Sequence, residues 1–263
     1  MKSSAKKVEL ASVDDLFSNE ERRADAQRER VLEIPLSELH PFKNHPFKVK
    51  DDEAMLETAD SIKQYGVLVP AIARPDPEGG YELVAGHRRH RASELAEKET
   101  MPVIVRDLDD DAATIIMVDS NLQRENILPS ERAFSYKMKL EAMKHQGMTC
   151  GQVGHKSRDA VSNDDSGRTI QRYIRLTNLV PPLLQMVDDG RIAFSPAVEL
   201  SYLTRDEQAE LWDLIGQEDA TPSRSQSLRM KQLSREAKLT PEVLYAILTE
   251  EKPNQKEQIR IKT

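Results

Sequence analysis

The hydrophobic pattern of this chain changes character at Asp109. Between residues 31 and 108, short apolar runs alternate with segments of helical spacing, whereas helical spacing continues through most of the chain after that point. Alternating strands and helices are typical of an α/β lobe, and a succession of helices is typical of an all-α domain. We therefore predict an α/β lobe followed by an all-α domain, an arrangement that 263 residues are long enough to form.

The lobe is expected to combine three strands with two helices, after a short apolar segment over residues 31–36. Acidic residues at the start, Met55, Ala59 and Ile62 on one face, and Gly66 at the end predict the first helix, over residues 51–65. Gly86 ends a strand and precedes the second helix, over residues 87–97. The expected strands cover residues 67–74, 81–85 and 101–108.

Helical signals dominate the second half of the chain. Ser166 fits the N-cap of a helix over residues 166–178, and Thr204 forms a capping box with Glu207. Residues 221–226 are polar and contain a proline, so they are predicted to be a linker. Four other helices are expected over residues 112–124, 129–146, 228–239 and 240–250. A further helix is expected from Pro181 to near Gly190, and another is expected to begin at Ser195.

These patterns divide the chain into four parts. Residues 1–30 are polar and are expected to be a flexible tail. Residues 31–125 are expected to form the α/β lobe, residues 126–220 the helical domain, and residues 221–263 a linker with short helices. The last residues resemble the start of a strand, so we expect the natural protein to continue beyond them.

Composition excludes several classes of protein. The sequence contains no apolar run of the ~18 residues that a membrane span needs, and its first residues lack the features of a secretory signal. Its single cysteine, Cys150, excludes an intramolecular disulfide and a multi-cysteine zinc site. We therefore expect a cytoplasmic protein without a membrane partner.

The net charge of −7 does not describe how charge is distributed along the chain. Residues 121–180 contain ten Lys and Arg residues against six Asp and Glu residues, and acidic blocks flank this basic segment. A local basic surface attracts nucleic acids even on an acidic protein, although ordinary solvated helices have similar compositions. Charge alone leaves both interpretations open.

Three arginines lie in the helix that follows Gly86, within its first turns. A glycine at such a turn lets the backbone approach a ligand, and the free N–H groups of a helix N-terminus bind anions. Arg88, Arg89 and Arg91 oppose the helix dipole there, which indicates an anionic ligand. Pairing of these arginines with nearby acids is the alternative explanation. Neither a Walker loop nor a dinucleotide fingerprint is present, because the required lysine and additional glycines are missing.

The helix expected over residues 166–178 has an apolar face and a face of long polar side chains. Arg168, Arg172 and Arg175 share the polar face, and Gln171 lies beside them. Arginine forks match guanine and phosphate, and glutamine can read adenine, when such a helix enters the major groove. The solvated face of an ordinary amphipathic helix is the alternative interpretation.

Three motifs occur here in the order and at the spacing of the ParB-type partition proteins. Gly86-His-Arg-Arg-His-Arg-Ala92 resembles that family's Gly-Glu-Arg-Arg-x-Arg-Ala box, and Gly66-Val-Leu-Val-Pro70 resembles its Gly-Val-Leu-Gln-Pro segment. Ser120-Asn-Leu-Gln-Arg124 resembles its Glu-Asn-Leu-Gln-Arg box. The resemblance covers roughly residues 31–215 and implies a ParB/sulfiredoxin-like α/β lobe followed by an all-α helix-turn-helix domain.

The resemblance implies that the lobe binds CTP with Mg²⁺ and uses the nucleotide to close a clamp on DNA. The motif around Gly86 would hold the phosphates, Gly66 and its neighbours would line the pocket, Asn121 would help to bind the metal, and Arg124 would support the site. The residues assigned to the nucleotide in this way are Gly66, Val67, Leu68, Gly86, His87, Arg88, Arg89, Asn121 and Arg124.

Two positions depart from the pattern of the family. His87 and Ser120 stand where the family usually has glutamate. Mg²⁺ prefers oxygen ligands, and both missing carboxylates would lie near the expected metal. We therefore expect CTP binding to persist, and hydrolysis of CTP to CDP and phosphate to be weak or absent.

The resemblance also implies that residues 166–178 are the recognition helix of a helix-turn-helix motif. Its first helix is expected near residues 148–154, where glycines interrupt the pattern, and residues 155–165 resemble an additional loop. A homodimer that binds a palindromic or repeated site on double-stranded DNA is implied. The residues assigned to DNA are Lys156, Arg158, Arg168, Thr169, Gln171, Arg172 and Arg175.

The implied role is the segregation of a chromosome, plasmid or mobile element, at the nucleoid or plasmid, with a ParA-type ATPase as a partner of residues 1–30. Two alternatives are a ParB-like transcriptional regulator with a degenerate nucleotide pocket and a small-molecule kinase on the same lobe. Sulfiredoxin chemistry is absent, because Ala85 and Gly86 precede His87 where that family has its catalytic cysteine.

Overall fold

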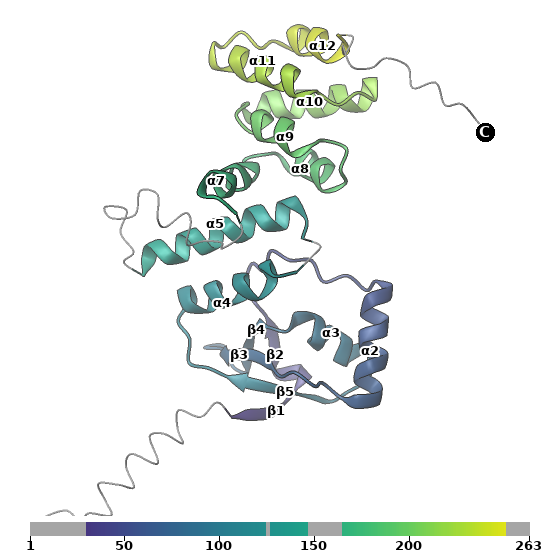
Figure 1. Ribbon diagram of the computed structural model, residues 1–263, viewed down its shortest axis with the longest axis vertical. Coiled ribbons are helices and arrows are strands. Elements are labelled where there is room, and N and C mark those ends of the chain that lie inside the picture. The colour runs from purple at the N-terminus through teal and green to yellow at the C-terminus, as the bar shows by residue number, and fades with distance from the viewer. Residues whose placement is uncertain (1–29, 125–126, 147–164, 251–263) are drawn as a thin grey trace, which may run out of the picture. The chain divides into compact units, whose positions relative to one another are not determined.

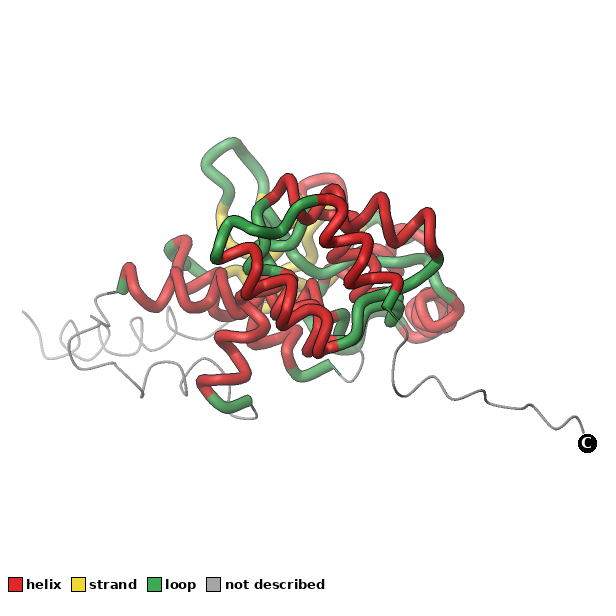
Figure 2. Tube along the Cα trace, turned by 90° about the horizontal axis from the view of Figure 1, so that it is seen from above, coloured by secondary structure: helices red, strands yellow, loops and turns green. Residues whose placement is uncertain are grey.

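The computed structural model describes residues 30–124, 127–146 and 165–250, which divide into two compact units (Figure 1). The first unit comprises the described residues up to Lys43 together with Val49–Leu108, and the second comprises Asn44–Lys48 and the described residues from Asp109 onward. Within the described ranges all strands lie in the first unit, while the second unit is built of helices, which are red in Figure 2. The predicted fold class, an α/β lobe followed by an all-α domain, is confirmed.

A mixed five-stranded sheet forms the centre of the first unit. Its strands are β1 (Val31–Pro35), β2 (Leu39–Pro41), β3 (Ala71–Pro75), β4 (Tyr81–Ala85) and β5 (Thr100–Val105), with the 3-10 turn η1 (Leu36–Glu38) between β1 and β2. The strand order is β1-β5-β3-β4-β2, in which β1–β5 and β3–β4 are antiparallel and β3–β5 and β2–β4 are parallel. Alternating residues such as Ala71 and Ala73 point into the core with Leu83 and Val103, as the period of a strand requires.

Two helices of the first unit pack against one another (Figure 1). They are α2 (Glu53–Tyr65) and α3 (His87–Leu95). The carboxylate of Asp52 caps α2 by accepting a hydrogen bond from the N–H of Met55 at 2.9 Å. Apolar residues three and four positions apart form the shared interface, as the sequence predicts. The buried residues of this interface are Met55, Ala59, Ile62, Ala92 and Ala96.

A buried carboxylate fastens the edge of the sheet. Glu82 of β4 is only 8% exposed, and it accepts a hydrogen bond from the N–H of Lys43 at 2.9 Å. Its other oxygen pairs with the guanidinium of Arg74 on β3 at 2.6 Å. Because both carboxylate oxygens have partners, the charge is accommodated in the interior, and the chain that follows β2 is held against β4.

Helices make up the second unit. They are α4 (Asp110–Leu122), α5 (Pro129–His145), α7 (Gly167–Leu176), α8 (Pro181–Asp188), α9 (Phe194–Leu200), α10 (Arg205–Glu218), α11 (Arg224–Arg235) and α12 (Pro241–Thr249). None of the helices in the described ranges is long and apolar enough to cross a membrane. Five successive helices, α7 to α11, each contribute a fully buried side chain to one hydrophobic core: Leu176, Leu183, Leu200, Leu211 and Met230.

The start of α5 is fixed by two carboxylates. Asp188, at the end of α8, accepts hydrogen bonds from the backbone N–H of Ser130 at 2.9 Å and from its hydroxyl at 2.6 Å. Glu131 accepts from the N–H of Leu128 at 3.1 Å and from the N–H of Lys48 at 2.8 Å. These acids satisfy free N–H groups and complement the positive end of the helix dipole.

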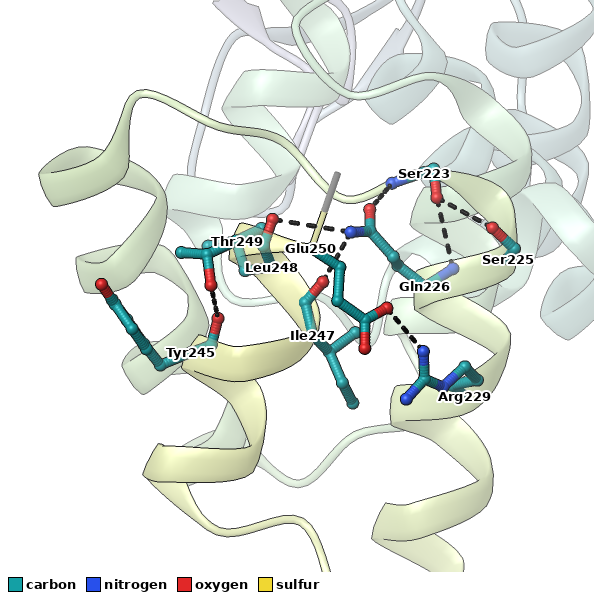
Figure 3. Close-up of polar contacts among 9 residues, drawn as sticks. All are labelled: Ser223, Ser225, Gln226, Arg229, Tyr245, Ile247, Leu248, Thr249 and Glu250. Carbon is teal, nitrogen blue, oxygen red and sulfur yellow. Dashed lines mark hydrogen bonds and ion pairs between the residues drawn. The ribbon is translucent and has the colours of Figure 1, made fainter. Parts of the chain in front are cut away.

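The buried side chain of Gln226 joins α11 to α12 (Figure 3). Its amide oxygen accepts a hydrogen bond from the N–H of Ser223 at 2.8 Å, which completes the capping box of α11. Its amide nitrogen donates to the carbonyl oxygen of Ile247 at 2.5 Å and is 3.5 Å from that of Leu248. Gln226 therefore satisfies groups at the start of one helix and at the end of another.

The predicted strand over residues 67–74 is partly wrong, because β3 begins only at Ala71. The residues before it form a loop, and the carbonyl groups of Val69 and Pro70 accept hydrogen bonds from the side chain of Arg89. Backbone groups that bond to a side chain in this way are not available to a neighbouring strand.

The predicted linker over residues 221–226 is also wrong. Ser223 caps α11, which begins at Arg224, and the helix packs in the same core as α7 to α10. The domain boundary expected near residue 125 stays a prediction, and the two compact units divide between Leu108 and Asp109. The reason is that α4 packs along α5 and belongs with the helices.

We expect Gln226→Glu to lower the free energy of unfolding by about 1–3 kcal/mol, because a carboxylate cannot donate to the carbonyl groups of α12. Urea titration followed by circular dichroism measures this change. The same substitution at exposed Gln217 is the control and should change the midpoint little. Equal midpoints for the two variants would show that the contact between α11 and α12 contributes nothing.

Candidate functional site

The turn between β4 and α3 requires glycine at position 86. Gly86 has a φ of +110°, which L side chains rarely adopt, and a Cβ atom there would lie 2.8 Å from the Cβ of Ala71. Gly86 is also the N-cap of α3, and it offers no side chain to the free N–H groups of the first turn. In contrast to α2, which Asp52 caps, α3 begins with its N–H groups uncapped by a side chain and with no acidic residue in its first turn.

Arg89 fixes the loop before β3. Its guanidinium donates to the carbonyl oxygens of Val69 and of Pro70, the latter at 2.7 Å. The side chain is half-buried, and this burial lowers the pKa of Arg89. The resemblance assigns Arg89 to phosphate binding, and the described structure gives its guanidinium a role in positioning the loop.

The neighbouring arginines pair with the acids that precede α2. Arg88 lies 3.3 Å from a carboxylate oxygen of Asp52, and Arg91 makes two contacts with Asp51, at 2.6 and 3.0 Å. Hydrogen bonds from Arg91 lower the pKa of Asp51, and those from Arg88 lower the pKa of Asp52. The charges of this first turn are therefore offset by acids, as the alternative interpretation of the sequence expects. Exposed pairs of this kind are weak, so another anion can compete for Arg88.

The predicted pocket residues after α2 point in different directions. Gly66 ends α2 with a φ of +75°, and its N–H donates to the carbonyl of Ile62 at 2.8 Å. Val67 is partly buried and packs against the cores on the sheet and between the helices. Leu68, in contrast, is 78% exposed. Val67 therefore anchors the loop, and Leu68 presents an apolar side chain to solvent.

His87 contacts the segment that follows β2. Its Nε2 atom lies 3.4 Å from the N–H of Phe42 and is positioned to accept a hydrogen bond from it. An imidazole that accepts at Nε2 carries its proton on Nδ1. His87 thus places an imidazole nitrogen where the family usually has a carboxylate.

Asn121 and Arg124 belong to the second unit and contact one another. The Asn121 amide donates to the carbonyl of Met117 at 2.8 Å, and its oxygen accepts from the Arg124 guanidinium at 3.3 Å. That oxygen is the only side-chain atom of Asn121 that can bind a metal, and one of its two lone pairs already faces the Arg124 guanidinium. No cluster of three His, Cys, Asp or Glu side chains suited to a metal exists among the described residues. In the described ranges, side chains of these four types therefore form no Mg²⁺ site made of protein ligands alone.

The predicted recognition helix is α7, and Ser166 caps it as the sequence indicates. Ser166 Oγ accepts from the N–H of Thr169 at 3.3 Å, and the fully buried Ile170 anchors the helix in the core. Arg168 is exposed, and Gln171 is partly exposed. In the described part of the chain, Arg168 makes no ion pair or hydrogen bond, so its guanidinium remains available to a ligand.

Arg172 and Arg175 rest on aromatic rings at the two ends of α9. The guanidinium of Arg172 lies 4.8 Å from the centroid of the Phe194 ring and donates to Ser195 Oγ at 2.9 Å. The guanidinium of Arg175 lies 3.9 Å from the centroid of the Tyr202 ring. Cation–π contact holds both side chains in place beside Arg168. Sequence reasoning missed these two supports, because no local pattern marks an aromatic residue that lies two helices away.

Part of the predicted helix-turn-helix motif lies outside the described residues. This applies to its first helix, expected near residues 148–154, and to Lys156 and Arg158. The tail over residues 1–29, expected to engage a ParA-type ATPase, also lies outside them. The assignments of individual residues to nucleotide and DNA therefore stay predictions.

We expect Arg172→Ala to destabilise the protein by about 1 kcal/mol, since the variant loses the contacts with Phe194 and Ser195. Arg168→Ala, at an exposed position of the same helix, should leave stability unchanged. Urea unfolding measures the midpoints of the two variants, and we expect a lower midpoint for Arg172→Ala than for Arg168→Ala. If both variants unfold at the midpoint of the wild type, the aromatic support of Arg172 has no energetic role.

Comparison with known proteins finds a family match over the N-terminal part of the chain. Residues 20–122 match the model of the family "ParB N-terminal domain", a range that extends from the first unit through α4 of the second. The resemblance to ParB-type partition proteins that the three motifs indicate is confirmed.

Curated relatives extend the similarity into the helical unit. The chain is 36% identical over 184 residues to "Chromosome-partitioning protein Spo0J" of Thermus thermophilus, covering 70% of this chain and 64% of the relative. It is 38% identical over 183 residues to "Probable chromosome 1-partitioning protein ParB" of Deinococcus radiodurans, covering 70% and 59%. The chain therefore spans about three fifths of the length of these relatives.

Two solved structures of ParB from Caulobacter crescentus also resemble this chain. One is a C-terminally truncated ParB complexed to the centromeric parS site, with a TM-score of 0.46 and 24% identity over 78% of this chain and 99% of that chain. The other is complexed with CTP-gamma-S, with a TM-score of 0.35 and 28% identity over 71% and 98%. TM-scores below 0.5 do not establish a shared arrangement of the whole chain.

Proposed function

We propose that this chain is a DNA-binding protein of chromosome partitioning whose ParB N-terminal domain binds CTP and gates a clamp on DNA. The observation that carries the proposal is the turn at Gly86, where α3 presents uncapped N–H groups and arginines inside a ParB N-terminal domain. Relatives that are named chromosome-partitioning proteins favour a chromosome over a plasmid as the cargo.

The lobe offers an anion three kinds of interaction. The free N–H groups of the first turn of α3 donate hydrogen bonds, and the positive end of the helix dipole attracts the charge. Arg88 would exchange Asp52 for the phosphate, and Arg89 would hold the loop at Gly66 in position. Binding of a cytidine nucleotide to a ParB of Caulobacter crescentus supports CTP as the nucleotide.

Mg²⁺ enters the proposal only as a companion of the nucleotide. Mg²⁺ at nucleotide sites is commonly held by the phosphates, by water and by one or two protein ligands. When bound there, it would offset the charge of the phosphates. Since His87 and Ser120 replace carboxylates and the Asn121 oxygen faces Arg124, hydrolysis of CTP is proposed to be weak or absent.

The helical unit would supply sequence recognition. Arg168, Thr169 and Gln171 lie toward the start and middle of α7, the part of a recognition helix that reads base edges. Arg172 and Arg175, already held on aromatic rings, would enter the groove with little loss of side-chain entropy. Binding as a homodimer to a palindromic or repeated site is part of this proposal, as is a ParA-type partner at residues 1–30. A relative bound to parS DNA supports DNA as the ligand.

Calorimetry with CTP, dCTP, ATP and GTP tests the nucleotide. We expect CTP to bind at least about tenfold more tightly than ATP or GTP, a difference of about 1.4 kcal/mol. Arg88→Gln should weaken CTP binding, whereas Arg91→Gln on the same helix should not. The same affinity for all four nucleotides, or no binding of any, would refute the assignment to CTP.

A second experiment tests the clamp. The DNA bound in cells is sequenced for a protein that can bind CTP and for a variant that cannot. We expect a sharp peak at the binding site for both, and spreading of the signal into the flanking DNA only for the protein that binds CTP. The Arg88→Gln variant supplies the incompetent protein, and Arg91→Gln supplies the matched control. A peak of identical width in both variants contradicts a sliding clamp.

The ion pairs of Arg88 and Arg91 favour one alternative, a DNA-binding regulator with a degenerate nucleotide pocket. In that protein the two acids would occupy the arginines permanently. DNA binding that does not respond to CTP would support the regulator over the clamp.

A further inference from the structure

Three cations surround the ring of Tyr202, the residue that follows the C-cap of α9. The distances to the ring centroid are 3.9 Å from Arg175 Cζ, 3.7 Å from Lys231 Nζ and 5.5 Å from Arg235 Cζ. Arg175 comes from α7, and the other two come from α11. The negative face of an aromatic ring attracts cations, so Tyr202 holds together positive charges that otherwise repel one another.

The charges in this cluster are only partly neutralised. Lys231 pairs with Glu199 of α9 at 2.5 Å, and both side chains are largely buried. Within the described residues, neither Arg175 nor Arg235 makes an ion pair. Arg175 instead donates to the carbonyl oxygen of Ser201 at 3.0 Å, and Arg235 is exposed. The cluster therefore carries an excess of two positive charges.

Two other charged side chains on the surrounding helices make polar contacts of their own. Glu207, in the first turn of α10, accepts from the N–H of Thr204 at 2.8 Å and from Ser234 Oγ at 2.7 Å. On α11, Arg229 pairs with Glu250 at 2.6 Å. Arg235 differs from Arg229 because its guanidinium lies on an aromatic ring with no carboxylate to offset it in the described structure.

We propose that Arg235, together with Arg175, binds a DNA phosphate beside the groove that α7 enters. This inference rests on the proposed function, since α7 must face DNA. Arg175 links the two surfaces, because it belongs to the recognition helix and lies on the same ring as Arg235. A guanidinium matches a phosphate with two parallel hydrogen bonds, and its planar form keeps the ring contact at the same time. The DNA-binding surface thus extends from α7 to the last turn of α11.

The salt dependence of DNA binding tests this extension. Fluorescence anisotropy with a labelled random-sequence duplex gives the dissociation constant over a series of KCl concentrations. Each phosphate contact contributes about 0.9 to the slope of log K against log salt. We expect Arg235→Gln to reduce the slope by about that amount, and Arg235→Lys to keep most of it. Arg229→Gln, on the same helix but paired with Glu250, should keep the slope of the wild type.

The outcomes separate this inference from the proposed function. If the wild type binds the duplex and Arg235→Gln keeps its slope, the contact at Arg235 is refuted and the proposed function stands. If the wild type does not bind duplex DNA at all, both the contact at Arg235 and the proposed function are refuted. Equal losses for Arg235→Gln and Arg229→Gln would indicate a general effect of surface charge and would also overturn the specific contact.

Discussion

The first unit depends on the close approach of Gly86 to Ala71. A side chain at position 86 would overlap the start of β3, so only glycine lets β4 turn directly into α3. The turn leaves the N–H groups of α3 without a side-chain cap, and Arg89, one turn further on, ties the loop before β3 to the same place. The absence of a Cβ atom at position 86 therefore lets β3, the loop before it and the start of α3 lie close together.

Arginine takes part in the polar contacts of both units in two different ways. In the α/β lobe, Arg74 and Arg88 pair with carboxylates, and Arg89 bonds to backbone carbonyl groups. In the helical unit, Arg229 also pairs with a carboxylate, but Arg172 and Arg175 are held by aromatic rings. A carboxylate cancels the charge of its partner, whereas a ring orients a guanidinium and leaves the charge available. The second arrangement suits side chains that meet an anion outside the protein.

The sequence predicts what depends on near neighbours in the chain. The spacing of Met55, Ala59 and Ile62 and the caps at Ser166 and Thr204 identify helices that the structure contains. The start of β3 could not be predicted, because Arg89, about twenty residues later, takes the carbonyl groups before it. The pairing of Arg88 with Asp52 and the support of Arg175 by Tyr202 are equally long-range. In contrast, the wrong prediction of a linker over residues 221–226 could have been avoided. Ser223 and Gln226 have the spacing of a capping box, which indicates the start of a helix.

The short segment Asn44–Lys48 belongs to the helical unit, although the chain on both sides of it belongs to the first unit. Its last N–H is bound by Glu131, which also caps α5. The polypeptide thus enters the helical unit, leaves it and enters it again. A fragment that began at Asp109 would leave an oxygen of Glu131 without this partner. Recombination that transferred the helices from Asp109 onward without Asn44–Lys48 would incur the same loss.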